Sequence, residues 1–238
     1  GLIVSDIRNP FFTDVSRAVE DMVHQEGYAL FLCNTDEDPS KEALYLDQME
    51  AQNVAGIIYS PTRQSAHNYG ELDISVPTVI IDRAVRSSDV DQVLIDNVEA
   101  AYRLTEHLIE NDYHRIAGLF GEASVTGRER RHGYEEALQA HDLAPPEGLV
   151  RHIPPKIEAG RETASEILRQ DDLPDAIITS NSLLTAGALM AIRERGLSVR
   201  DQIGLVGFDG TTWGELVEPA VTIIAQPTYE IGTTAAEL

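Results

Sequence analysis

The sequence predicts an α/β protein made of two similar lobes, each a doubly wound parallel sheet covered by helices. Short apolar, β-branched runs alternate with amphipathic, helix-length segments along most of the 238 residues. The alternation breaks once, where only a polar loop separates Thr78–Asp82 from Gln92–Asp96, and a second series of strand–helix pairs begins at Asn97. No low-complexity segment or short-period repeat interrupts the pattern.

The first lobe begins directly with a strand. A helix follows it, because Phe12, Val15, Val19 and Met22 recur at helical spacing and Gly27 supplies the stop. Asp38-Pro39 has the form of an N-cap followed by proline in the first turn. The strands expected in this half are Leu2–Ile7, Ala29–Asn34, Gly56–Ser60, Thr78–Asp82 and Gln92–Asp96.

The second lobe repeats this plan from Asn97 onward. Its expected strands are Ile116–Gly121, Leu149–Ile153, Ala176–Ser180, Ile203–Asp209 and Val221–Ala225, with a last helix from about Pro227. The chain is expected to cross between lobes near residues 95 and 224. The N-terminal lobe would then hold 1–95 plus 225–238, and the C-terminal lobe 96–224.

The two lobes predict a ligand site. Ligands of open parallel sheets bind beyond the carboxyl ends of the strands. If the lobes face each other, both sets of strand ends line one cleft.

The charge argues against nucleic-acid binding by this polypeptide alone. Lys plus Arg total 18 against 40 Asp plus Glu, which gives a net charge of −22, whereas DNA affinity rests largely on basic side chains. The acidic surface fits either adaptation to high salt or an ordinary acidic cytosolic protein, and both interpretations stay open.

The sequence carries no recognisable catalytic or metal motif. Phosphate-binding Gly-x-x-x-x-Gly-Lys, Gly-x-Gly-x-x-Gly after the first strand and His-Glu-x-x-His are all missing, as is a Gly-x-Ser-x-Gly elbow. The single Cys33 excludes an internal disulfide. We therefore expect no enzyme activity, no cofactor and no metal.

Eight segments occur in an order that resembles the LacI/GalR (lac-repressor) family of transcription regulators, and the resemblance covers essentially the whole chain. They are Asp6–Phe12, Asp82-Arg83, Leu94–Asn97, His107–Ile116, Glu129–Tyr134, Ser180-Asn181, Gly204–Asp209 and Gln226-Pro227.

The resemblance implies a periplasmic-binding-protein-like (type I) effector-binding core whose helix-turn-helix DNA-binding headpiece is absent from this chain. It also implies a cytoplasmic homodimer that binds a small metabolite, with a sugar or sugar acid favoured, and contacts operator DNA through the missing headpiece. The family usually has Asn-Asp where this chain has Asn181-Ser182, which removes a carboxylate from the expected cleft. The alternative function is a periplasmic sugar receptor for a transporter.

The expected effector contacts are polar or aromatic residues near strand ends. Carboxylates and amides accept from hydroxyls, arginine forks onto a carboxylate or vicinal hydroxyls, and an aromatic ring supplies a flat wall. The residues are Phe11, Ser60, Asp82, Asp96, Ser124, Arg130, Asn181, Asp209, Lys156 and Trp213.

Each of these residues also has a purely structural interpretation. Asp96 and Asp209 could cap the elements that follow them, and Arg130 could form a surface ion pair with Glu129 or Glu135. Phe11 could lie in the core with Phe12. Lys156 could be solvated, and Trp213 could pack on the lobe surface.

Overall fold

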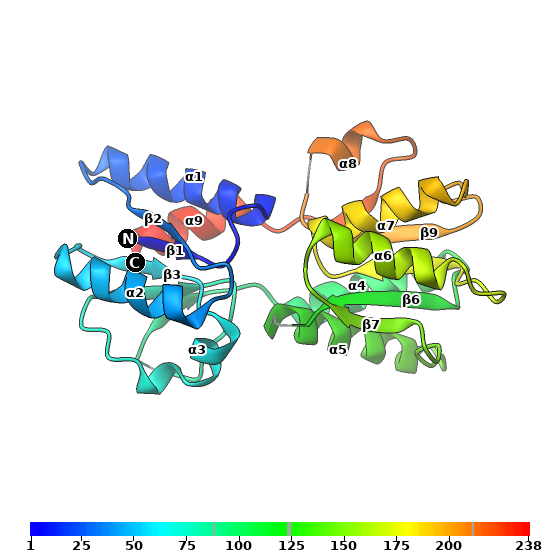
Figure 1. Cartoon of the computed structure of the whole chain (residues 1–238), viewed down its shortest axis with the longest axis horizontal. Coiled ribbons are helices and arrows are strands. Elements are labelled where there is room, and N and C mark those ends of the chain that lie inside the picture. The colour runs from blue at the N-terminus through cyan, green and yellow to red at the C-terminus, as the bar shows by residue number, and fades with distance from the viewer. Residues whose placement is uncertain (88, 123–124, 211) are drawn as a thin grey trace. The chain divides into compact units, whose positions relative to one another are not determined.

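The computed structural model describes residues 1–87, 89–122, 125–210 and 212–238, which form two compact units (Figure 1). Unit 1 comprises Gly1–Ile95 and Pro227–Leu238, and unit 2 comprises Asp96–Gln226. Each unit is a parallel sheet with helices on both faces, which confirms the α/β, doubly wound class expected from the sequence.

Unit 1 has a five-stranded sheet in the order β2-β1-β3-β4-β5. Its strands are β1 (Leu2–Val4), β2 (Leu32–Asn34), β3 (Ile57–Tyr59), β4 (Thr78–Ile81) and β5 (Asp91–Val93). Its helices are α1 (Pro10–Gln25), α2 (Pro39–Ala51), α3 (Arg63–His67), the 3-10 turn η1 (Tyr69–Glu71) and α9 (Thr228–Glu237).

Alternating side chains of the unit 1 strands point to opposite faces, as the pleat requires. Leu2 and Val4 pack with Val15 of α1 and Ile231 of α9 in one apolar cluster. In Figure 1, α2 and α3 lie on the other side of this sheet from α1 and α9. The sheet is therefore buried from both sides.

Unit 2 repeats the arrangement in the order β10-β9-β8-β6-β7. Its strands are β6 (Ile116–Gly121), β7 (Val150–Ile153), β8 (Ala176–Thr179), β9 (Gly204–Phe208) and β10 (Thr222–Ile224). Its helices are α4 (Asn97–Glu110), α5 (Val125–Ala140), α6 (Ile157–Ile167), α7 (Ser182–Glu194) and α8 (Thr212–Leu216).

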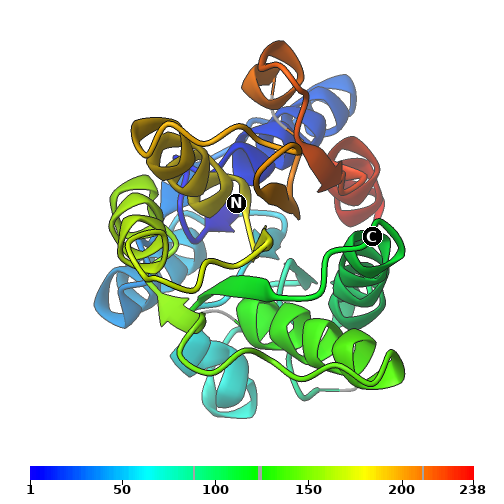
Figure 2. The same ribbon diagram turned by 90° about the vertical axis from the view of Figure 1, so that its right-hand side faces the viewer.

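The two faces of the unit 2 sheet carry separate apolar clusters. Leu119 and Ile177 pack with Ile167 of α6 and Ala188 of α7. Phe120 and Ile178 pack on the other face, with α4 and α5. Figure 2 shows these two helix pairs, α4 with α5 in green and α6 in yellow-green with α7 in gold, on opposite sides of the strands.

Both sheets share one strand order. Numbered within its own unit, each runs 2-1-3-4-5, and every pairing is parallel. The order reverses between the first and third strands, which are β1 and β3 in unit 1 and β6 and β8 in unit 2. In sheets of this kind the ligand crevice lies at that reversal, beyond the carboxyl ends.

The expected strand bounds are one to three residues too long at several ends. Leu2–Ile7 was expected, but pairing stops at Val4 and Asn9 caps α1 by accepting from the Phe11 N–H. Ala29–Asn34 was expected as a strand, but only Leu32–Asn34 pairs, at the edge of the sheet. Phe31 and Leu32 are exposed there, because an edge strand has one neighbour.

Glycines allow helices to pack closely within each unit. A Cβ on Gly133 of α5 would lie 2.0 Å from the Val98 carbonyl oxygen of α4, and one on Gly187 of α7 would lie 2.3 Å from the Ile157 carbonyl of α6. Both nearest atoms belong to the backbone, so they cannot move aside without displacing a helix.

Replacement of Gly133 by alanine therefore tests this contact. Gly133→Ala should lower the free energy of unfolding by about 1–3 kcal/mol, because the added methyl overpacks the α4–α5 contact. Gly70→Ala is the matched control, since its Cβ would meet nothing within 4 Å. Urea unfolding measures both; equal midpoints for the two variants would contradict the explanation.

None of the helices within the described residues is long and apolar enough to cross a membrane.

Candidate functional site

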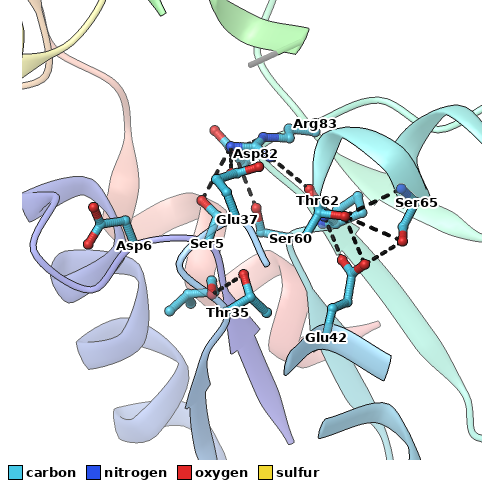
Figure 3. Close-up of polar contacts among 12 residues, drawn as sticks. Ser5, Asp6, Thr35, Glu37, Glu42, Ser60, Thr62, Ser65, Asp82 and Arg83 are labelled. Carbon is cyan, nitrogen blue, oxygen red and sulfur yellow. Dashed lines mark hydrogen bonds and ion pairs between the residues drawn. The ribbon is translucent and has the colours of Figure 1, made fainter. Parts of the chain in front are cut away.

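A buried arginine lies at the strand reversal of unit 1. Arg83 follows β4 and donates from Nη1 to the Pro61 carbonyl at 2.9 Å and from Nη2 to Ser5 Oγ at 3.3 Å. Its guanidinium also forms ion pairs with Glu37 and, at 3.2 Å from Nε, with Asp82 Oδ2. Figure 3 shows Ser5, Glu37 and Asp82 gathered around the Arg83 guanidinium.

The acidic partners keep this buried guanidinium charged. Arg83 is only 5% exposed, and burial alone lowers the pKa of the guanidinium, but Glu37 and Asp82 offset that effect and hold the pKa above its ordinary value. Removing one partner would leave an uncompensated buried charge, which is strongly destabilising. Arg83 therefore fixes the positions of Glu37 and Asp82 relative to the sheet.

Two of the expected effector contacts meet beside Arg83. Ser60 follows β3 and is fully buried, and its Oγ donates to Asp82 Oδ2 at 3.3 Å. Asp82 adopts a left-handed backbone conformation, with φ 67°, which aspartate tolerates better than most residues.

Phe11 lies in the unit 1 core. It is 3% exposed and packs edge-on against Phe12, with the ring centroids 5.0 Å apart. The structure thus shows the arrangement in which both rings belong to the core. A stacking role for Phe11 stays a prediction.

A second buried arginine lies at the strand reversal of unit 2. Arg130 of α5 is 3% exposed, donates from Nη1 to the Ser180 carbonyl at 2.6 Å and from Nε to Asn97 Oδ1 at 2.8 Å. Its guanidinium carbon lies 4.0 Å from the centre of the Phe208 ring, a cation–π contact. Arg130 thus lies in the interior of unit 2, not at its surface.

Further polar residues follow the strands β8 and β9, next to the partners of Arg130. Asn181 caps α7 by accepting from the Leu184 N–H at 2.9 Å. Asp209 is 5% exposed, has φ 68°, and accepts from Gln226 Nε2 at 2.5 Å. Asp82 and Asp209 each follow the fourth strand of their own unit, and both adopt the left-handed conformation.

The structure places the remaining expected residues as follows. Asp96 is the exposed N-cap of α4 and accepts from the Glu99 N–H at 2.9 Å. This is the capping role that was the alternative to an effector contact. Lys156 is exposed at the start of α6 without a side-chain cap bond. Trp213 is half-buried against the apolar cluster of α6 and α7. Ser124 lies outside the described residues.

Sequence reasoning missed Arg83 and Asn97 as site residues. Both belong to segments that carry the family resemblance, yet neither position by itself signals burial. Asn97 is 4% exposed and holds Arg130 with its Oδ1 while its amide nitrogen donates to Glu129 Oε2 at 2.9 Å. The signal that could have found them is their place directly after Asp82 and Asp96, two residues that were expected at the site.

Two buried tyrosines make the stability of the fold sensitive to alkaline pH. Burial raises the pKa of Tyr59 in β3 well above its ordinary value of 10.0, and the nearby Glu42 charge raises it further. Burial likewise raises the pKa of Tyr134, whose hydroxyl donates to the Ile116 carbonyl at 2.7 Å.

The unfolding free energy should therefore fall as pH rises above 10. The unfolded chain ionises these tyrosines near pH 10 while the folded chain keeps them protonated, so each contributes a loss of up to about 1.4 kcal/mol per pH unit. Urea midpoints at pH 9, 10 and 11 measure the slope. Tyr59→Phe should have a shallower slope, and an unchanged slope would contradict the assignment to Tyr59.

Comparison with known proteins gives one family over the whole chain. The family model described as "Periplasmic binding proteins and sugar binding domain of LacI family" matches residues 1–238. The chain is similar to the ribose operon repressor of Halalkalibacterium halodurans, with 33% identity over 239 residues that cover 100% of this chain and 70% of the relative.

Two solved structures with bound sugars are similar over the full chain. A LacI family transcriptional regulator from Enterococcus faecium, with bound ribose, has a TM-score of 0.84 and 25% identity. A periplasmic binding protein/LacI transcriptional regulator from Alkaliphilus metalliredigens QYMF, complexed with D-xylulofuranose, has a TM-score of 0.85 and 28% identity. Each comparison covers 100% of this chain and 87% of the solved one.

Proposed function

Because the chain belongs to the LacI family of transcription regulators, we propose that it is the effector-sensing and dimerisation core of such a regulator. Its effector is a sugar or sugar acid held by polar groups at the carboxyl ends of the strands. The observation that carries this proposal is Arg130, buried in unit 2, where it bonds the Ser180 carbonyl next to Asn181 and lies over the Phe208 ring next to Asp209. The family's curated relatives are repressors rather than enzymes.

The chemistry of these strand ends suits a ligand rich in hydroxyl groups. Carboxylates of Asp82 and Asp209 accept hydrogen bonds, and the amide nitrogen of Asn181 donates to no residue that the structure describes. The similar solved chains hold ribose and D-xylulofuranose. A cleft between the two lobes, expected from the sequence, stays a prediction within this proposal.

Effector binding would regulate DNA binding by a population shift. An effector that prefers one arrangement of the two units raises the population of that arrangement, and the coupling between effector and DNA must be reciprocal. The net charge of −22 supports DNA contact through another part of the full-length regulator, in the cytoplasm. The curated relatives considered are regulators, which favours this function over a periplasmic receptor.

A sugar screen tests the proposed effector class. D-Ribose, D-xylulose, hexoses and sugar acids are added to the chain, and at least one should raise the melting temperature, because a ligand that binds only the folded state stabilises it. No shift with any member at millimolar concentration would contradict the proposal.

Arg130→Ala should weaken binding of the sugar found in that screen by about thirtyfold or more, the equivalent of about 2 kcal/mol for a lost charge-assisted contact. Arg103→Ala is the control, because Arg103 forms an exposed ion pair with Glu99 on α4. Calorimetry below the melting temperature of each variant gives the affinities. Equal sugar affinity of Arg130→Ala and the native chain would show that Arg130 does not contribute to sugar binding.

The assembly proposal has a separate test. The 238-residue chain should sediment as a homodimer and should not shift operator DNA in a gel, because its surface is strongly acidic. A monomer at high micromolar concentration would contradict the dimer. Salt-sensitive DNA binding by this chain would contradict the assignment of DNA contact to another segment.

A further inference from the structure

One peptide group beyond the end of β3 is held from both sides by buried, oppositely charged side chains. The carbonyl oxygen of Pro61 accepts from Arg83 Nη1 at 2.9 Å, and the N–H of Thr62 donates to Glu42 Oε1 at 2.6 Å. These two atoms belong to the same peptide bond. Arg83 is 5% exposed and Glu42 is 2% exposed.

The Glu42 carboxylate has three donors from the loop that follows β3. Besides the Thr62 N–H, it accepts from Thr62 Oγ1 at 2.8 Å and from Ser65 Oγ. A carboxylate buried this deeply is stable only when several hydrogen bonds replace its water. Figure 3 shows Glu42 reaching from α2 to Thr62 and Ser65 on the α3 side.

The peptide group lies between β3 and α3, so the sheet does not fix its orientation. Ser60 precedes it directly, and its Oγ donates to Asp82, which itself pairs with Arg83. The Pro61–Thr62 peptide is therefore next in sequence to a hydroxyl that bonds Asp82, while the Ser60 N–H itself donates to the Ile3 carbonyl at 2.9 Å.

We propose that Glu42 and Arg83 are positioning residues that grip the Pro61–Thr62 peptide and so hold Ser60 and Asp82 at the carboxyl edge of the unit 1 sheet. We call this arrangement the peptide clamp. Neither residue was expected to contact the effector, and the clamp acts through Ser60 and Asp82. Its link to effector binding rests on the proposed function, but the clamp itself does not.

Amide hydrogen exchange followed by NMR tests the clamp without any ligand. In the native chain the Thr62 amide should exchange slowly for a loop residue, and its proton should resonate downfield, as expected of an amide bonded to a carboxylate. Glu42→Gln should reduce the downfield shift and accelerate Thr62 exchange about tenfold or more, because the neutral amide oxygen of glutamine is a weaker acceptor than the carboxylate. Arg83→Met should accelerate Thr62 exchange as well.

Ser65→Ala is the matched control. It removes one hydrogen bond from the same carboxylate but leaves the bond from the Thr62 N–H, so Thr62 exchange should stay within about twofold of the native rate. Uniform acceleration of all unit 1 amides in Glu42→Gln, or no acceleration at Thr62, would overturn the proposal. If neither Glu42→Gln nor Arg83→Met folds, the exchange rate of the Thr62 amide in the native chain tests the proposal. Fast exchange of that amide in the native chain would overturn it.

Calorimetry with D-ribose then tests the link to binding. Glu42→Gln should weaken D-ribose binding about tenfold while Ser65→Ala leaves it unchanged, since only the first releases the peptide that positions Ser60. Equal weakening in both variants would overturn the positioning role. If the native chain does not bind D-ribose, that result counts against the proposed effector, and the exchange data still decide the clamp.

Discussion

All strand pairings in both sheets are parallel, and this constraint determines where polar chemistry can lie. Parallel strands end at a common edge, so the polar residues that terminate them collect there, while the strands themselves are buried on both faces. The shared 2-1-3-4-5 order then sets a reversal between the first and third strands of each unit. A buried arginine lies at that reversal in both units, although Arg83 comes from the loop after a strand and Arg130 from a helix.

The two arginines are stabilised in different ways. Arg83 pairs with the carboxylates of Glu37 and Asp82, so acidic groups of its own unit hold its guanidinium in place. The described contacts of Arg130 include an amide oxygen, a carbonyl oxygen and the Phe208 ring, none of which carries a formal charge. Arg83 therefore holds acidic residues of unit 1 in place, whereas Arg130 links α5 to the residue that follows β8 and to the ring of Phe208 in β9.

The alternation of apolar and amphipathic segments was enough to predict the fold class, the strand that begins the chain and the Asp38-Pro39 helix start. Strand ends were set too long because Ser5 and Asp6 continue the local pattern, whereas pairing stops where β1 loses its neighbours. Sequence reasoning brought Ser60 and Asp82 into one candidate site, and the structure joins them. It could not find Glu42, because a carboxylate on an amphipathic helix looks solvated until the loop it bonds is known. Nor could it separate the cap at Asp96 from a ligand contact, since both chemistries need the same residue in the same place.

The left-handed conformation of Asp82 and Asp209 limits how this protein can evolve. At a φ near 67° a β-branched or bulky side chain would strain the backbone, whereas asparagine and glycine fit. At Asp209, exchange of aspartate for asparagine would replace an acceptor by a group that also donates, whereas at Asp82 it would remove a carboxylate that pairs with buried Arg83. Descendants of such a chain could thus acquire new ligand preferences through one amide-for-acid replacement in unit 2, while most other replacements at these two positions would first have to rebuild the turn.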